Sequence, residues 1–187
     1  ELFEEFPDAP IAAASLGQVY KARLQGQHWV AVKVQRPNLT FILRRDLVLI
    51  RALGVMTAPL LPLNLGFGLG GIIDEFGRSL FEEIDYGLEA DNAERFSALF
   101  ADNDAVYIPK VERMLSSTRV LTTTWIDGAK MRDSEELRSQ RLDPTALIRT
   151  GVICGLQQLL EFGYFHADPH PGNLFALPGR TGDLGHV

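Results

Sequence analysis

The sequence predicts an α+β fold in which a small lobe built on an antiparallel sheet carries a helical insert and leads into the beginning of a helical second lobe. Alternating apolar residues predict strands between residues 11 and 34. Apolar residues at helical spacing predict helices over residues 38–56 and 72–100. Nearly half of the 187 residues are apolar, which is enough for a folded core.

Composition narrows the class of protein. Asp and Glu number 24 against 18 Lys and Arg, and no basic run occurs, so we expect no nucleic-acid partner. The only cysteine, Cys154, cannot form an internal disulfide, which favours a reducing, intracellular setting. Because the chain begins without methionine or a signal-like segment and stops just after Asp183, we expect it to be truncated at both ends.

The first lobe begins with an acidic lead-in over residues 1–10. Three short strands then form a meander, at Ile11–Ala12, Val19–Leu24 and His28–Val34. The tripeptide Gln25-Gly26-Gln27 supplies the turn between the second and third strands.

The insert follows as a helix over residues 38–56 and then an apolar stretch. No charged residue occurs from Ala52 to Ile73, a length sufficient to cross a bilayer. Pro59, Pro62 and the glycines of residues 66–71 would break a lipid-facing helix, so we favour an apolar loop packed on the protein or resting on a membrane surface. The glycine run lacks the preceding strand and Lys-Ser/Thr ending of a phosphate-binding loop, and it is interpreted as a flexible linker.

A single acidic helix is predicted from Ile72 to Phe100, with Glu82, Asp85 and Glu89 sharing one face. An acidic helix face is usually only solvated. Here a lone upstream lysine needs a carboxylate partner, and that favours a functional role for the face.

Two further strands are predicted at Val106–Val111 and Thr118–Trp125. The dipeptide Asp127-Gly128 then provides a turn-like exit that suits a hinge between lobes. A last helix is expected from the cap Asp143 to the stop signal Gly163.

The run HADPHPGN, residues 166–173, holds the most chemistry. It places the Asp168 carboxylate and the Asn173 carboxamide five residues apart, and Asp183 follows shortly after. Such groups suit phosphoryl transfer, which requires Mg²⁺ ligands and a residue that orients the attacking oxygen. Asn173 and Asp183 are the candidate metal ligands, and Asp168 is the residue that would orient or deprotonate the acceptor.

Positive charge on the phosphates must come from elsewhere in the chain. Lys33 closes the apolar strand segment Val30-Ala31-Val32-Lys33, and Glu89 can hold it through an ion pair. A lysine at the end of a strand is more commonly just exposed to solvent. The ordered set of residues around Lys33 favours a phosphate-binding role instead.

This ordered set resembles the protein-kinase-like superfamily and, within it, the atypical UbiB (AarF) family. The glycine-rich loop of kinases, G-x-G-x-x-G-x-V, here has alanine at its first two glycine positions and keeps Gly17 and Val19. This alanine-rich loop, Val30–Pro37, and Glu83-Ile84-Asp85-Tyr86 with Glu89 downstream are similar to UbiB motifs. The Lys-x-Gly-Gln motif of that family, expected upstream, is not in this chain.

The resemblance implies a kinase-like domain that uses ATP and Mg²⁺, with residues 1–126 as the first lobe and hinge and residues 127–187 as the start of the second. It assigns phosphate-loop contacts to Ala12, Ala13, Ala14, Ser15, Gly17 and Val19, and adenine contacts to the backbone of Thr124 and Ile126. It further implies ATPase or kinase activity supporting isoprenoid-quinone (ubiquinone) biosynthesis or lipid metabolism. The expected partners are a quinone-pathway or lipid intermediate and quinone-biosynthesis proteins, at an intracellular location peripheral to a membrane.

Two alternatives stay open. Residues 176–182 lack the apolar strand that normally delivers the metal-binding aspartate, so a catalytically inactive pseudokinase, acting as a nucleotide-binding or scaffold module, is one of them. The other is a metallohydrolase that uses His166, Asp168 and His170, although it leaves Lys33 and the alanine-rich loop unexplained.

Overall fold

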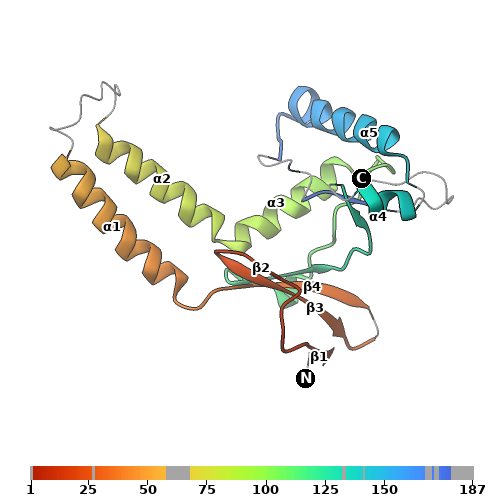
Figure 1. Cartoon of the computed structure of the whole chain (residues 1–187), viewed down its shortest axis with the longest axis horizontal. Coiled ribbons are helices and arrows are strands. Elements are labelled where there is room, and N and C mark those ends of the chain that lie inside the picture. The colour runs from red at the N-terminus through yellow and green to blue at the C-terminus, as the bar shows by residue number, and fades with distance from the viewer. Residues whose placement is uncertain are drawn as a thin grey trace. The chain divides into compact units, whose positions relative to one another are not determined.

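The computed structural model has the predicted α+β architecture (Figure 1). It divides into two compact units, the first comprising Glu1–Asn92 with Val111–Thr123 and the second Ala93–Lys110 with Thr124–Val187. The structure describes residues 2–26, 28–57, 68–131, 134–140, 142–166, 170 and 173–177.

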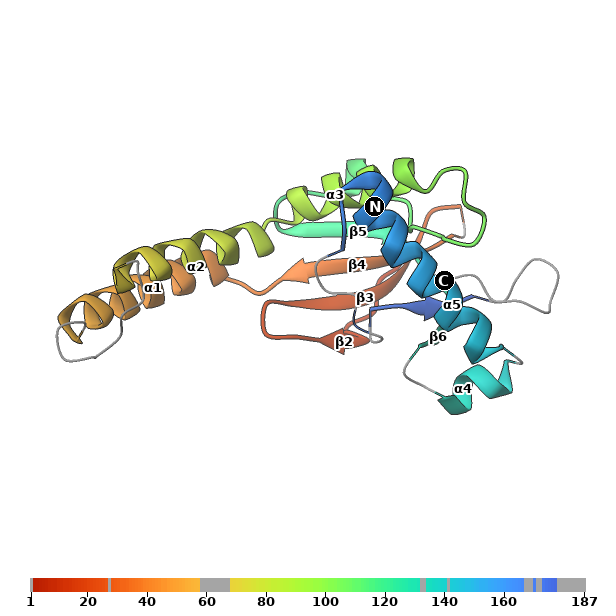
Figure 2. The same cartoon turned by 90° about the horizontal axis from the view of Figure 1, so that it is seen from above.

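A five-stranded sheet forms the centre of the first unit (Figures 1 and 2). Its strands are β1 (Phe3–Glu5), β2 (Ala12–Ala13), β3 (Gly17–Leu24), β4 (Trp29–Gln35) and β5 (Val120–Thr124). The order is β1-β3-β4-β5, and β2 also pairs with β3. The long antiparallel β3–β4 pair, with Gly17 opposite Gln35 and Arg23 opposite Trp29, confirms the central part of the predicted meander.

Two expectations about this sheet are wrong. Residues 1–10 are not only a lead-in, because β1 pairs with β3, with Phe3 opposite Leu24, and Phe3 packs against the buried core of the sheet. Residues 106–111 do not form a strand; they contribute only an isolated bridge between Val111 and Thr123. Strand-like composition is insufficient where no neighbouring edge continues the hydrogen-bond ladder.

The insert is a pair of packed helices, α1 (Leu39–Thr57) and α2 (Leu69–Glu83), called the helical arm below (Figure 1). The predicted first helix is confirmed. The flexible linker predicted at residues 66–71 is wrong for Leu69–Gly71, which form the first turn of α2, while residues 58–67 lie outside the described part of the chain. In that described part, no helix is both long enough and apolar enough to cross a bilayer.

The single helix predicted from Ile72 to Phe100 is in fact two, α2 and α3 (Tyr86–Leu99). The break has a local cause, because the Asp85 side chain accepts a hydrogen bond of 2.9 Å from the Gly87 amide and so caps α3. Asp85 therefore starts a new helix, and the shared acidic face predicted for Glu82, Asp85 and Glu89 does not exist.

The second unit contains mainly helices. They are α4 (Ser134–Ser139), α5 (Pro144–Gln157) and a five-residue π-helical turn, Gln158–Phe162. The predicted cap and stop of the long helix are confirmed, since Asp143 accepts a 2.9 Å hydrogen bond from the Thr145 amide and Gly163 is left-handed with φ of 59°. Helix α4 and the short pair β6 (Ala129–Lys130) with β7 (Phe175–Ala176) were not predicted.

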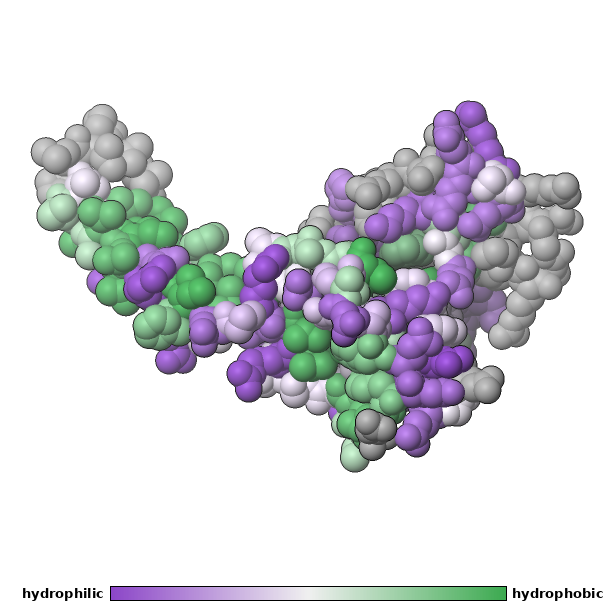
Figure 3. All heavy atoms as spheres, turned by 60° about the horizontal axis from the view of Figure 1, so that its bottom comes forward, coloured by the Kyte–Doolittle hydropathy of each residue, from purple (hydrophilic) through white to green (hydrophobic). Residues whose placement is uncertain are grey.

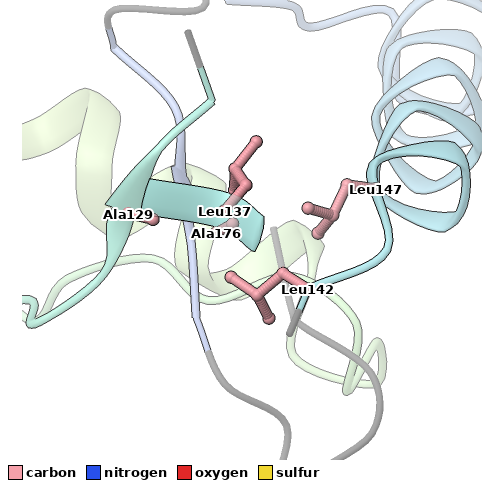
Figure 4. Close-up of a cluster of buried hydrophobic side chains, with 5 residues drawn as sticks. All are labelled: Ala129, Leu137, Leu142, Leu147 and Ala176. Atoms are coloured by element: carbon pink, nitrogen blue, oxygen red, sulfur yellow. The ribbon is translucent and has the colours of Figure 1, made fainter. Parts of the chain in front are cut away.

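Each unit has its own buried apolar cluster. In the first unit Ala22, Leu24, Val30 and Val32 pack on one face of the sheet. Figure 4 shows the cluster of the second unit, which gathers side chains from β6, β7, α4 and α5: Ala129, Leu137, Leu142, Leu147 and Ala176. Leu137, Leu142 and Leu147 point toward one another and thereby hold the start of α5 against the short strands.

Candidate functional site

The first unit brings Lys33 and Glu89 together as predicted. The Lys33 ammonium lies 2.8 Å from Oε1 and 2.7 Å from Oε2 of Glu89, so both carboxylate oxygens accept from one amine. The two side chains are 37% and 42% exposed. An ion pair exposed to that degree contributes only about 0–1 kcal/mol to folding. Stability therefore does not account for the pairing of two residues 56 positions apart in the sequence.

A third residue, Tyr86, completes this arrangement. The Lys33 ammonium lies 4.6 Å from the centroid of the Tyr86 ring, a cation–π contact, so the cation is held by an aromatic face as well as by the carboxylate. Tyr86 is only 2% exposed, and burial followed by the nearby Glu89 charge raises the pKa of its hydroxyl. That hydroxyl has no hydrogen-bond partner among the described residues.

Local sequence explains why these groups meet. Side chains alternate along β4, so Val30 and Val32 enter the buried core while Lys33 faces the other side of the sheet, toward α3. The segment that begins α3 is tied at two points, to the end of β4 and to the turn before β5. Gln35 donates to the Ile84 carbonyl at 2.8 Å, and the Tyr86 amide donates to the Thr118 carbonyl at 3.2 Å. Glu89 follows one turn later on the same helix.

The alanine-rich loop is a β-hairpin. Ala12 pairs with Val19 and Ala13 with Gln18, and the Ala14 amide donates to the Gly17 carbonyl at 2.9 Å across the turn that contains Ser15. In the described part of the chain, positive φ occurs only at Asn38, Gly26 and Gly163. The alanines therefore adopt ordinary extended or turn conformations, and the loop has no left-handed residue.

Gly17 is required by space rather than by its φ angle. A Cβ added there would collide with the Tyr86 hydroxyl and would lie 2.9 Å from the Val34 carbonyl oxygen. The one glycine that this loop keeps therefore allows Tyr86 to approach the end of β3. The phosphate-loop candidate and the Lys33–Glu89 pair are thus connected through a single aromatic residue.

Arg36 was missed by sequence reasoning, which treated it only as part of a family motif. Its Nε donates to the Ala14 carbonyl at 3.0 Å, and its backbone amide donates to the Leu16 carbonyl at 3.0 Å. Both ends of the loop turn are thereby fixed to the residue that follows β4, three positions after Lys33.

The second unit contains three of the predicted site residues that the structure describes, Thr124, Ile126 and Asn173. The Thr124 amide donates to the Lys110 carbonyl at 2.9 Å, so an adenine contact from Thr124 would have to use its carbonyl. Ile126 is half-buried. Asn173 is exposed, and its backbone amide donates to the His170 carbonyl at 2.8 Å.

Two predicted residues, Asp168 and Asp183, lie outside the described residues. Among the residues that are described, no group of three or more His, Cys, Asp or Glu side chains is placed to hold a metal ion. Asn173 supplies a carboxamide oxygen, and the sequence supplies two carboxylates nearby in the chain. This hard-oxygen donor set is the kind that Mg²⁺ prefers.

An apolar hollow of about 450 Å³ lies on the first unit, lined by residues that include Phe3, Val32, Val34 and Leu115. Because Val32 and Val34 alternate with Lys33, this hollow faces away from the ion pair. None of the predicted site residues lines it.

Known proteins are similar to this chain along most of its length. The sequence matches the ABC1 atypical kinase-like domain over residues 1–184. An uncharacterized protein of Synechocystis is 52% identical across 96% of this chain and 32% of its own length. In Arabidopsis thaliana, the chloroplastic protein ACTIVITY OF BC1 COMPLEX KINASE 1 is 45% identical across 100% of this chain and 28% of its own length. The chain spans about a third or less of the length of these curated relatives.

A chloroplastic aarF domain-containing protein kinase of the same plant is 40% identical across 92% of this chain and 24% of its own length. The solved complex of Rv3197 with erythromycin, from Mycobacterium tuberculosis, superposes with a TM-score of 0.73 at 29% identity and covers 100% of this chain and 46% of that one. The alanine-rich loop, the Lys33–Glu89 pair and these matches lead to one conclusion. The chain belongs to the ABC1 (UbiB/AarF) family of atypical kinase-like domains.

Proposed function

We propose that this chain is the nucleotide-binding part of an atypical kinase or ATPase, which binds Mg-ATP and hydrolyses or transfers its γ-phosphate. The observation that supports it is the Lys33–Glu89 pair beneath the alanine-rich loop. Phosphoryl transfer needs a fixed positive charge on the nucleotide phosphates, and an ammonium held by two carboxylate oxygens and an aromatic ring supplies a fixed charge.

Each residue has a distinct role in the proposal. Lys33 binds the phosphates, and Glu89 positions Lys33. The hairpin from Ala12 to Val19, which includes Ser15 and Gly17, covers the phosphates, with backbone amides as donors. The carbonyl of Thr124 and the backbone of Ile126 take the adenine. A loop of ordinary alanine conformations should fit the phosphates differently from a glycine-rich one.

Asn173 and Asp183 would hold Mg²⁺, which, when bound, neutralises charge on the phosphate oxygens. Asp168 would orient the acceptor oxygen and take its proton. Because the acceptor is either water or an organic hydroxyl, the same residues serve an ATPase or a kinase.

The experiment measures Mg-ATP binding by calorimetry and ADP release by a coupled assay. Asp168→Asn should abolish ADP release and leave binding largely intact, because the amide cannot accept the proton. Lys33→Ala should weaken binding itself. Unchanged turnover in Asp168→Asn would remove that residue from its role, and unchanged binding in Lys33→Ala would make Lys33 an ordinary strand tip.

A non-catalytic nucleotide-binding or scaffold module is the second candidate. The short interval between Asn173 and Asp183 favours it, since the strand found there among the described residues, β7, is only two residues long. The same two measurements separate the candidates, because a pseudokinase binds the nucleotide and releases no ADP.

We also propose that the whole protein acts in isoprenoid-quinone biosynthesis or lipid metabolism, with a lipid or quinone-pathway intermediate and quinone-biosynthesis proteins as partners. Membership of the ABC1 family supports this context. Loss of the gene should lower the cellular quinone content, and a copy with Asp168→Asn should fail to restore it. Restoration by that copy would show that the context does not depend on phosphoryl transfer.

A further inference from the structure

The Tyr86 hydroxyl is an unusual polar group in the first unit. Tyr86 is 2% exposed, and its hydroxyl is buried without a hydrogen-bond partner among the described residues. Figure 3 shows hydrophobic residues gathered over the helical arm and hydrophilic residues on the surface beyond it, where water satisfies polar groups. Buried hydroxyls nearly always have a partner. Folding alone does not explain this one, because a phenylalanine would fill the same space without burying a polar group.

The hydroxyl lies directly against the alanine-rich loop. A Cβ added at Gly17 would collide with it, and the next two atoms nearest to that Cβ belong to the backbone of Val34. No other side chain comes as close to that position. The loop therefore meets the hydroxyl through bare backbone.

The ring of the same side chain contacts the cation of the candidate site. The Lys33 ammonium lies 4.6 Å from the ring centroid of Tyr86 while both carboxylate oxygens of Glu89 accept from it. In the proposed function, Lys33 binds the phosphates and the loop covers them. Tyr86 thus joins the two proposed phosphate-binding parts, with its hydroxyl at the loop end.

The loop can part from the hydroxyl without disturbing a packed core. Residues 11–15 are all exposed, and β2 contributes only two residues. The bonds from Arg36 that hold the turn, to the Ala14 and Leu16 carbonyls, are polar. Segments with few buried apolar contacts open locally at a small fraction of the free energy of global unfolding. A phosphate oxygen that enters under the loop would then meet a donor that lacks an acceptor.

We propose that Tyr86 is a phosphate-binding residue, whose hydroxyl donates a hydrogen bond to a phosphate oxygen of the nucleotide that Lys33 holds. This inference rests on the proposed function, because its ligand is the phosphate chain of Mg-ATP. Burial and the Glu89 charge raise the pKa of the hydroxyl, so it stays protonated and able to donate at neutral pH. Nucleotide binding supplies the acceptor that the fold leaves absent.

The test compares affinity with stability in Tyr86→Phe, which keeps the ring against Lys33 and removes only the hydroxyl. Calorimetry should show Mg-ATP binding weaker by about tenfold or more, the loss expected for a hydrogen bond to a charged group. The melting temperature should equal or exceed that of wild type, because a buried unpaired hydroxyl is gone. A residue that only supports the fold would not lose affinity while keeping stability. Adenosine, which has no phosphate, should bind both chains with affinities within about twofold.

Tyr20→Phe is the matched control on the other face of the same sheet. The Tyr20 ring packs against the buried apolar cluster of the sheet, and its hydroxyl donates to the Gln18 side chain at 3.2 Å. Removing a hydroxyl that has a partner should lower the melting temperature slightly and leave Mg-ATP affinity unchanged. An equal loss of affinity in both variants would overturn the inference, because it would assign the effect to the sheet.

The remaining outcomes separate this inference from the proposed function. Weaker Mg-ATP binding in Lys33→Met with full affinity in Tyr86→Phe would overturn only the role of the hydroxyl, as expected if a buried water is its partner. Wild-type affinity in the Gly17→Ala, Tyr86→Phe double variant would also overturn it, because the hydroxyl would then act as a spacer. A wild-type chain that binds no Mg-ATP would overturn the proposed function and this inference with it.

Discussion

Removing a charge from the Lys33–Glu89 pair should change the stability of the chain little and its affinity for nucleotide strongly. The pair is more than one-third exposed at both ends, so its contribution to folding is about 0–1 kcal/mol, and the cation–π contact with Tyr86 adds about 0.5–1 kcal/mol. For a chain of this size 1 kcal/mol corresponds to about 2–4 °C in melting temperature. Lys33→Met should therefore melt only a few degrees below wild type.

Nucleotide affinity should change far more. A hydrogen bond to a charged group is worth about 1.5–3 kcal/mol, which at about 1.4 kcal/mol per tenfold corresponds to Mg-ATP binding weaker by roughly ten- to a hundredfold. Glu89→Gln should show a smaller loss, since Glu89 acts through Lys33. The double variant should resemble Lys33→Met alone.

Calorimetric titration with Mg-ATP, together with thermal melting, measures both quantities. Arg78→Met is the matched control, because it breaks another exposed ion pair, with Glu75, on the same unit. It should alter neither value appreciably. A Lys33→Met variant with a much lower melting temperature and unchanged affinity for Mg-ATP would contradict the separation of the two effects. So would additive losses of affinity in the Lys33 and Glu89 variants.

Two further predictions concern the aromatic link between the loop and the pair. Gly17→Ala should lower the free energy of unfolding in urea by about 1–3 kcal/mol, because the new Cβ meets the Tyr86 hydroxyl and the Val34 carbonyl. Adding Tyr86→Phe should recover part of this loss. No recovery would exclude the hydroxyl as the obstacle. Burial and the Glu89 charge raise the pKa of Tyr86 above its usual 10, so the unfolded chain loses this proton first and stability falls as pH rises above about 10. The Tyr86→Phe variant should be at least as stable as wild type at pH 7, since it removes a buried hydroxyl with no partner among the described residues. Its free energy of unfolding should fall less steeply as pH rises. Equal pH dependence of the two free energies of unfolding from pH 8 to 11 would contradict this.

Part of the site could be predicted from the sequence because the charge and position of each residue already indicate its role. Lys33 follows the apolar residues Val30 to Val32 near the end of β4, and Glu89 lies on a helix where an upstream lysine needs a carboxylate. The structure places the two side chains in contact. The cap Asp143 and the stop Gly163 were predictable for a similar reason, since capping depends on the local backbone alone.

The residues that were missed act through tertiary contacts. Tyr86 looks like one apolar position on a helix until the sheet brings Gly17 against its hydroxyl. Asp85 is an exception with a local cause, since its side chain caps α3 through the Gly87 amide although helical periodicity continues across it. In β1, Phe3 was hidden in an acidic, proline-containing segment because its pairing partner, Leu24, lies far along the chain. Periodicity cannot show such partners.

Arg36 has a mechanical consequence for ligand selection. Its two hydrogen bonds fasten the loop turn at Ala14 and Leu16 to the residue that follows β4, the strand that bears Lys33. Under the proposed function, an inhibitor that displaces this turn has to break both bonds, whereas a narrower one that fits beneath the turn breaks neither. Chemical libraries tested against this domain should therefore be enriched in flat, narrow scaffolds.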